Sequence, residues 1–508
     1  MNTPKIVLGP LLGVESDSDY TICILINHKD LPEINEIHLS VNHKIYHSIQ
    51  SETILDKYTF LRFEFNFSRP EYDGKIITYY FTYKNEKLVS AFNERIFDIY
   101  ISAITRDKGV ALVSCSGSHS ASPSKLLPED FGGWKKIIYK RPDLLILAGD
   151  QVYAETIWNS LPEVKKILKS KKKNVTPQIE KQICEFYCEL YIESWKQCDI
   201  GLTLATIPNI MTWDDHDIID GYGSLPDHYQ NSQLLDFIFK TAKKYYGLFQ
   251  IRGENKTLIN PGYDFSAILS WRNYKFVIPD TRSHRNKNQI IHQQQYDLIE
   301  NVFLKKNSFV AEKNTVLAFV LPVPIAHRKY SIWLEKQADK VFYAVEKIWS
   351  GVIKYSLDDD LLDHWEHHEH EQEQKYMLNM IFKIGNHLKP KNLIVLSGDV
   401  HFSGASKIEK SANQIVRTAT QIISSPIVNK PFSARIGNFL AKYSTDTNQI
   451  GDCTISDFKD FGDYKNKMFT RRNFIIIKKR SDNNSLNCAM YYEPWESKPF
   501  FRNVNKFR

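Results

Sequence analysis

Five short apolar runs, each ending in polar residues, constrain the fold of this chain more than any other feature of its sequence. They span 111–114, 144–148, 207–212, 275–278 and 393–397, and a sixth run at 315–321 is predicted to pair with them. Helical patterns fill the gaps, at 178–196, 230–249, 289–303 and 357–387. Short strands that alternate with long helices are typical of an α/β fold built on a largely parallel sheet.

Residues 1–105 show a different pattern, in which short segments of strand type are separated by turn residues. Examples are TICILINH and KIITYYFTY, whose apolar residues alternate or run together between Asn, Asp, Pro and Gly. About six or seven such strands in roughly 100 residues are typical of a small β-sandwich. We therefore predict an accessory β-sandwich domain over 1–105 and a catalytic domain over 106–508.

The composition is that of an ordinary globular protein, with 42% hydrophobic and 25% charged residues in a chain of 508. These proportions argue against a disordered chain or a coiled-coil rod. The formal net charge of +7 is a weak excess that suits an anionic substrate without requiring nucleic acid. We expect no nucleic-acid partner, and we assign the basic run at 165–173 to solvated surface. The sequence does not indicate the oligomeric state.

Three features of the sequence bear on where the protein resides. No apolar run approaches the ~20 residues of a transmembrane helix, so we expect no membrane span. The N-terminal segment MNTPKIVLGPLLGVESDSDYT has no apolar core followed by a small-residue cleavage site, so we expect no signal peptide. Seven scattered cysteines favour a reducing compartment over a disulfide framework. We therefore predict a cytoplasmic location.

The polar clusters after the apolar runs contain the residue types that bind metals and phosphates. In chain order they are Cys115; Asp150 and Tyr153; Asp215 and His216; Arg282; and Asp399 and His401. Ligands of open α/β sheets bind outside the carboxyl ends of the strands, so we expect these side chains to share one crevice.

Metal ions would explain how three carboxylates can share that crevice. Unpaired, Asp150, Asp215 and Asp399 would repel one another and be driven toward their neutral forms. Oxygen ligands together with a thiolate, a phenolate and an imidazole indicate a mixed site. Two metals bridged by one aspartate could clamp both oxygens of an in-line displacement and acidify a water. Arg282, with Arg285 as a rival, would offer a bidentate fork to a phosphate.

Structural explanations remain open for each of these residues. Cys115 could be a buried core thiol. It could also be the nucleophile of a thiol phosphatase, but that chemistry needs an arginine six positions later, and residue 121 is Ala. Asp150 could cap a helix, and Tyr153 could simply pack. The remaining alternatives are turn residues for Asp399 and His401 and a structural ion pair for Arg282. Asp214 and Asp217 we place outside the site, as partners of His216 or of an arginine.

A histidine cluster at His364, His367, His368 and His370 offers a second candidate metal site. His364 and His368 would share one helix face, but the pattern His-Glu-x-x-His is absent. We assign the cluster to a solvated helix face or to residues that contact the metal ligands without binding the metal, and its role stays open. Neither a phosphate-binding Gly-x-x-x-x-Gly-Lys-Ser/Thr loop nor Gly-x-Ser-x-Gly occurs, which argues against a P-loop nucleotidase and a serine hydrolase.

The motifs GDQVYA, TWDDHDIIDGYG, DTRSHR and LSGDVH occur in this order. Together with GPLLG near the start and DDLLDHWEHHEHE, they resemble the alkaline phosphatase D (PhoD-like) branch of the calcineurin-like metallophosphoesterases. This resemblance implies a four-layer α/β/β/α metallophosphatase core with an N-terminal β-sandwich. It also implies a site that holds Fe³⁺ and one or two Ca²⁺ ions, with other divalent metals as alternatives.

The resemblance also implies roles for the site residues. Cys115, Asp150 and Tyr153 would bind iron, with Asp150 bridging to the second metal. Asp215 stands where the superfamily has a metal-binding Asn, and His216 matches its transition-state or leaving-group histidine. The two remaining ligands, Asp399 and His401, match the Gly-His-x-His positions.

The implied function is a metal-dependent phosphoester hydrolase. A metal-bridging hydroxide would attack phosphomonoesters, phosphodiesters or both, with Arg282 neutralising charge. Alternatives are a phosphodiesterase or phospholipase acting on lipid or polymer substrates, and a non-catalytic scaffold that retains the fold. Cys115 stands where the wider superfamily has Asp-x-His, and this difference agrees with the PhoD-like branch. The sequence departs from the pattern at Ser283-His284, where many relatives have Ser-Tyr. It also has no Arg-Arg pair near the N-terminus.

Overall fold

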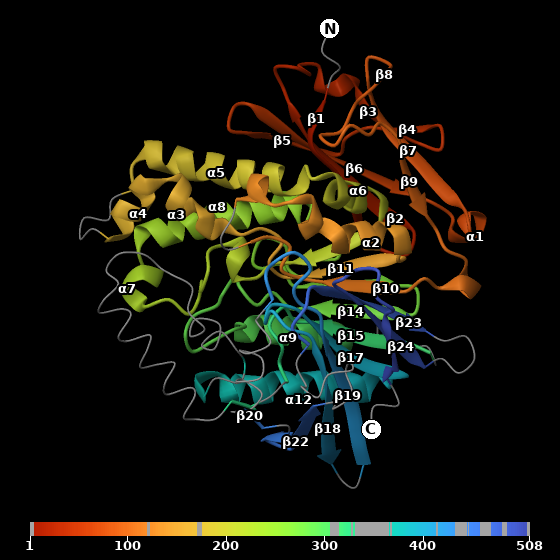
Figure 1. Cartoon of the computed structure of the whole chain (residues 1–508), viewed down its shortest axis with the longest axis vertical. Helices are drawn as coiled ribbons and strands as arrows, with labels where there is room; N and C mark the ends of the chain where they lie inside the picture. Colours follow the sequence, from red (N-terminus) through yellow and green to blue (C-terminus); the bar gives the residue numbers. More distant parts are fainter. Residues whose placement is uncertain are drawn as a thin grey trace.

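The fold consists of two stacked β-sheets with helices on their outer faces (Figure 1). The computed structural model describes residues 5–118, 122–169, 175–304, 314–326, 329–330, 365, 368–412, 415–431, 444–445, 447–457, 469–479 and 485–504. Structural statements below concern these residues.

The first sheet has ten strands in the order β25-β24-β23-β10-β11-β12-β1-β2-β6-β5. Its centre is parallel and is formed by β10 (Val110–Val113), β11 (Leu144–Ala148) and β12 (Asn209–Thr212). One edge is antiparallel and consists of β23 (Asn473–Lys479), β24 (Leu486–Tyr492) and β25 (Phe500–Asn503).

The second sheet has eight strands in the order β13-β14-β15-β17-β19-β18-β22-β21. Its parallel strands are β14 (Tyr274–Ile278), β15 (Val316–Val320), β17 (Asn392–Ser397) and β19 (Ile415–Ile423). Antiparallel strands flank them: β13 (Ala267–Trp271), β18 (Gly404–Ala412), β22 (Cys453–Asp457) and β21 (Thr447–Ile450).

The alternation of side chains along the strands explains the layers. Leu112 and Ile146 of the first sheet share a buried cluster with Phe276 of the second sheet. Their neighbours Val113 and Leu147 face the other way and join a cluster with helices of the first face. Successive strand residues point to opposite faces, so strands that are apolar throughout must be covered on both sides.

Helices supply the two outer layers (Figure 1). The first face is covered by α2 (Gly132–Lys140), α5 (Pro177–Trp195), α6 (Cys198–Thr206) and α8 (Gln233–Phe249). The second face is covered by α9 (Gln293–Leu304) and α12 (Glu371–Leu388). The remaining short α-helices are α1 (Arg69–Tyr72), α3 (Ile157–Ser160), α4 (Pro162–Lys169) and α7 (Asp227–Gln230). The predicted α/β/β/α core is confirmed, and within the described residues none of the helices has the length and apolar character that crossing a membrane requires.

The N-terminal strands belong to two sheets. The ten-stranded sheet includes β1 (Ile6–Val14), β2 (Asp19–Asn27), β5 (Gln50–Ile54) and β6 (Tyr58–Asn66), and β1 pairs with β12 through Gly13 and Asn209. A separate sheet contains β3 (Ile37–Val41), β4 (Lys44–Tyr46), β7 (Ile76–Tyr83), β8 (Glu86–Lys87) and β9 (Phe97–Tyr100). Because hydrogen bonding continues from these strands into the core sheet, the domain boundary at 105 stays a prediction.

Most predicted elements have counterparts whose bounds differ by a few residues. The strand predicted at 144–148 coincides with β11, and the helix predicted at 178–196 is shifted by one residue from α5. The helix predicted at 357–387 is described from residue 368 on, as a 3₁₀ turn (His368–His370) followed by α12, because residues 357–364, 366 and 367 lie outside the described part of the chain.

Candidate metal centre

The loops after β10, β11 and β17 have unusual backbone conformations. Cys115, Asp150, Asp399 and His401 have positive φ angles of 55°, 59°, 60° and 51°. Non-glycine residues rarely adopt such angles, and those that do cluster at functional sites. At Gly398, an added Cβ would lie 2.4 Å from the carbonyl oxygen of Ala148, so the β17 loop must approach the β11 loop closely.

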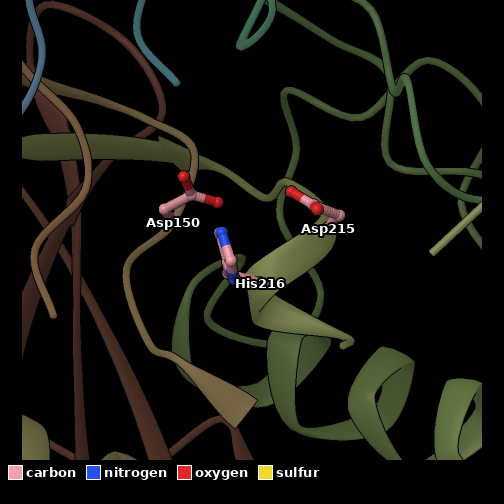
Figure 2. A group of neighbouring side chains, drawn as sticks. All are labelled: Asp150, Asp215 and His216. Atoms are coloured by element: carbon pink, nitrogen blue, oxygen red, sulfur yellow. The ribbon is translucent and has the colours of Figure 1, made fainter. Parts of the chain in front are cut away.

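Four acidic side chains from the loops after β11, β12 and β17 meet here. Ligand atoms of Asp150, Asp214, Asp215 and Asp399 all lie within 4.8 Å of one another, and so do those of Asp150, Asp215 and His216. Figure 2 shows the carboxylates of Asp150 and Asp215 and the imidazole of His216 turned toward one shared space. The structure therefore brings together four predicted site residues, and it adds Asp214, which was predicted to lie outside the site.

This acidic group has the chemistry of a cation site. Asp150 is fully buried, and its Oδ1 has no hydrogen-bond partner among the described residues. Burial raises the pKa of Asp150 well above its ordinary value, and Asp214 and Asp215 raise it further, while His216 lowers it. Arg282 and His216 offset part of the negative charge of these carboxylates. A bound cation would offset more of it, because buried carboxylates that lack a partner are costly. The residues therefore fit a bound metal.

Cys115 lies against this group from the end of β10. Its buried Sγ donates to Asp150 Oδ2 at 3.3 Å and lies 3.1 Å from Ser425 Oγ. Burial raises the pKa of the thiol well above its ordinary value, and Asp150 and Asp399 raise it further. A thiol beside this many carboxylates becomes a thiolate readily only when a cation is bound.

Tyr153 borders the same group. Its ring stacks on the imidazole of His216, with 4.4 Å between the ring centroids. Burial raises the pKa of its phenol well above the ordinary value, Cys115 and Asp150 raise it further, and a hydrogen bond with Asn429 opposes them. The predicted ligands Cys115, Asp150 and Tyr153 are thus neighbours in the structure.

His216 is held between two further acids. Its Nδ1 lies 3.2 Å from Glu155 Oε2 and its Nε2 lies 3.9 Å from Asp220 Oδ1. Burial lowers the pKa of His216, but the carboxylates of Glu155, Asp215 and Asp150 outweigh burial and raise it well above its ordinary value. Glu155 was not among the predicted site residues, although it directly follows the motif GDQVYA.

Arg282 is fully buried beside the acidic group. Its Nε donates to the carboxylate of Asp214, and its Nη1 donates to the carbonyl oxygen of Tyr222 at 3.0 Å. Its Nη2 lies 3.5 Å from Asp215 Oδ1. The predicted pairing of Asp214 with an arginine is present, and the same contact places the guanidinium at the edge of the site.

His401 shares a neighbour with Cys115, because Ser425 contacts both residues. It belongs to neither of the groups described above, and its Nε2 lies 3.4 Å from Asn429 Nδ2. Its backbone N–H donates to Ser425 Oγ at 3.2 Å. Asn429 and Ser425 were not predicted, because nothing in the spacing of the sequence marks them. A ligand role for His401 remains a prediction.

The second histidine cluster is described only in part. His364 and His367 lie outside the described residues, and of the other two only the side chain of His370 is described, as buried. The predicted role of this cluster therefore stays open.

Comparisons with known proteins show which family the chain resembles. The family model of PhoD related phosphatases matches residues 132–347 and 345–470, which contain every predicted site residue except Cys115. Uncharacterized protein YGR266W of Saccharomyces cerevisiae is 28% identical over 531 aligned positions, which cover 87% of this chain and 70% of that protein.

A solved structure of PhoD shares the fold. The superposition has a TM-score of 0.58 and covers 99% of this chain and 90% of that chain, at 14% sequence identity. An identity this low shows a common architecture only. The family model, in contrast, matches more than half of the chain, and the chain therefore belongs to the family of PhoD related phosphatases.

Proposed function

We propose that the protein is a metal-dependent phosphoester hydrolase, and family membership supports a phosphoesterase function at this coarse level. The observation that carries the proposal is the buried group of Asp150, Asp214, Asp215 and Asp399, whose ligand atoms lie within 4.8 Å of one another. Four carboxylates at that spacing suit hard cations such as calcium.

A mixed pair of metals suits the donors around Asp150. The thiol of Cys115, the phenol of Tyr153 and the carboxylate of Asp150 would hold a ferric ion. The other carboxylates, Asp215 and Asp399, would hold calcium. When bound, these cations supply Lewis acidity toward phosphoryl oxygens and water.

The chain's own residues have separate tasks in the proposed reaction. Arg282 neutralises negative charge on the phosphoryl oxygens, because its guanidinium lies at the edge of the site with Nη2 3.5 Å from Asp215. Asp214 fixes the guanidinium plane through Nε. A fully buried guanidinium loses little entropy when it binds an anion, since its position is already set.

His216 donates a proton to the leaving alcohol. The contact between Nδ1 and Glu155 Oε2 at 3.2 Å orients the ring and leaves Nε2 as the other proton-carrying atom. The stacked ring of Tyr153 limits rotation of the imidazole. A positioned general acid of this kind contributes about 10²–10⁴-fold to rate.

Elemental analysis combined with turnover tests the proposal. The purified protein is assayed for iron and calcium, and then for hydrolysis of p-nitrophenyl phosphate and bis-p-nitrophenyl phosphate with and without added calcium. Iron together with calcium-dependent turnover is the expected result, and the two esters separate monoesterase from diesterase activity. Folded protein that binds neither metal and hydrolyses neither ester would contradict the proposal and favour a scaffold.

A further inference from the structure

The loop after β19, residues 424–429, joins two of the segments that form the candidate metal centre. The backbone N–H groups of Val428 and Asn429 donate to the carbonyl oxygen of Cys115 at 3.2 Å and 3.1 Å. The backbone N–H of Ser424 donates to the carbonyl oxygen of Ser397, at the end of β17, at 3.0 Å. This loop has no task in the reaction proposed above, yet it ties the loop after β10 to the end of β17.

The hydroxyl of Ser425 lies where these segments meet. Its Oγ is 3.1 Å from Sγ of Cys115, donates to the carbonyl oxygen of Asp399 at 3.2 Å and accepts from the backbone N–H of His401 at 3.2 Å. Ser425 is fully buried, and its own carbonyl oxygen accepts from Nδ2 of Asn473 at 2.8 Å. The hydroxyl is therefore held in place, and it fixes the sulfur of Cys115 relative to the loop after β17.

A hydroxyl carries a single proton, which limits how Ser425 and Cys115 can interact. With the thiol protonated, either atom of the contact can be the donor, and Ser425 can give its proton to the Asp399 carbonyl. A sulfur that binds a metal has lost its proton and can only accept. The contact then stays favourable only with Ser425 as the donor, which gives up the bond to Asp399.

Asn429 makes a second pair of contacts from the same loop. Its buried side chain hydrogen-bonds the phenol of Tyr153, and its Nδ2 lies 3.4 Å from Nε2 of His401. Ser425 and Asn429 thus each contact His401 and one of the residues proposed to hold iron. Neighbours that hydrogen-bond metal ligands orient those ligands and tune the metal.

We propose that Ser425 is a positioning residue of the candidate iron site: its hydroxyl fixes the sulfur of Cys115 and donates a hydrogen bond to that sulfur when iron is bound. Asn429 has the matching role for Tyr153. The inference rests on the proposed metal-dependent function, and it extends that function to residues that bind no metal themselves.

Ser425→Ala tests the proposal through the affinity for iron and the reduction potential of the iron. The iron affinity should fall about 10–100-fold, which is typical when a partner of a metal ligand is removed. The calcium affinity should fall much less, because Ser425 contacts Asp399 through the backbone carbonyl and not through the carboxylate.

The potential reports the hydrogen bond itself. In Ser425→Ala loaded with excess iron, the sulfur lacks a donor and gives more charge to the metal. The potential should therefore become more negative than in the wild type, and the visible absorption band should shift. Metal titration and a redox titration followed by absorption measure these changes.

Ser424→Ala is the matched control, and Asn429→Ala is a second test variant. Ser424 is fully buried, and its Oγ donates to Oδ1 of Asn473 at 3.0 Å, so its removal costs a buried hydrogen bond at the neighbouring position. It should keep the iron affinity and the potential of the wild type. Asn429→Ala should lose iron affinity as Ser425→Ala does, and it carries the test if Ser425→Ala does not fold.

Turnover of the p-nitrophenyl esters separates this inference from the proposed function. If the wild type holds iron and is active, but the test variants match Ser424→Ala in iron affinity and potential, the inference is wrong and the proposed function stands. If the wild type binds no iron, the inference is also wrong, and turnover with calcium or other divalent metals decides the proposed function separately.

Discussion

The carboxylate of Asp217 accepts a hydrogen bond from the backbone N–H of Asp150 and so joins the loop after β11 to its own loop after β12. Asp217 Oδ2 accepts hydrogen bonds from the backbone N–H groups of Asp150 at 3.0 Å and Asp214 at 2.9 Å. Its Oδ1 accepts from those of Gln151 at 3.1 Å and Val152 at 3.2 Å. These bonds offset the strained φ of 59° that Asp150 adopts.

Asp217→Asn should destabilise both the site and the fold. An asparagine presents an NH₂ group to backbone donors, so at least one N–H loses its acceptor in a buried place. We expect the free energy of unfolding to fall by about 2–4 kcal/mol and metal affinity to fall about tenfold or more. Chemical denaturation and metal titration measure these changes. Asp236→Asn, at a carboxylate that is 56% exposed, is the matched control; equal losses in the two variants would show that Asp217 has no special role.

Asp150→Asn should separate activity from stability. Burial raises the pKa of this carboxyl, so the neutral amide removes a cost that the metal-free protein bears. Turnover of p-nitrophenyl phosphate should become undetectable in Asp150→Asn and also in Asp215→Asn. Both variants should still fold. In the presence of a chelator, Asp150→Asn should unfold at the same or a higher denaturant concentration than the wild type. Full activity in either variant would contradict the assignment of these residues.

Iron binding should depend on Cys115, and the colour of the iron-loaded protein should depend on Tyr153. Cys115→Ser should lose iron while keeping calcium, because a hydroxyl is a much poorer ligand for iron than a thiolate. Tyr153→Phe should lose the visible absorption band that a phenolate gives to ferric iron. Elemental analysis and absorption spectra of the purified variants test both. Iron retained at full occupancy in Cys115→Ser would show that the thiol is a packing residue.

His216→Ala should slow the reaction most for poor leaving groups. Loss of a general acid costs about 10²–10⁴-fold, but p-nitrophenolate leaves without protonation, so the loss should be smaller for p-nitrophenyl phosphate than for an alkyl phosphate. Glu155→Gln should show the same pattern more weakly, since it orients the ring through Nδ1. Equal losses for both kinds of ester would indicate that His216 acts on the phosphoryl group instead.

A separate acidic pair should make stability depend on pH. Burial, together with a hydrogen bond and repulsion from Asp143, raises the pKa of Asp107 from 3.8 to about 6, although Arg272 lies nearby. Because the folded state binds this proton more tightly than the unfolded state, the contribution is fully present below about pH 4 and is lost as the pH rises through about 6.

Asp107→Asn should therefore gain stability relative to the wild type as the pH rises from 4 to 7. The gain should be about 1–2 kcal/mol, less than the full pKa shift implies, because the amide also gives up the contact with Arg272. Denaturation of the metal-free proteins at several pH values measures it. The exposed Asp297→Asn should show no such trend, and a flat difference for Asp107→Asn would contradict the prediction.

Much of the fold follows from local patterns in the sequence. Runs such as 144–148, apolar at every position, predict strands covered on both faces, and the strand β11 has these bounds. The stacking of two sheets does not follow from any single run. Leu144 and Leu145 look alike in the sequence, but Leu144 packs between the sheets and Leu145 packs against the outer helices. The path of β1 into the core sheet beside β12 was not foreseen either, since a parallel pairing between Gly13 and Asn209 leaves no local signal.

The sequence by itself determined which residue types stand at the strand ends, and therefore the metal-binding chemistry near Asp150, Asp215 and Asp399. Only the tertiary structure decided which side chains meet. It brought Asp214 into the acidic group and left His401 against Asn429. It also paired His216 with Glu155 across 61 positions. The physical reason is that residue types record chemistry locally, whereas contacts depend on how distant loops pack and on buried hydrogen bonds, such as those of Asp217, that hold them in register.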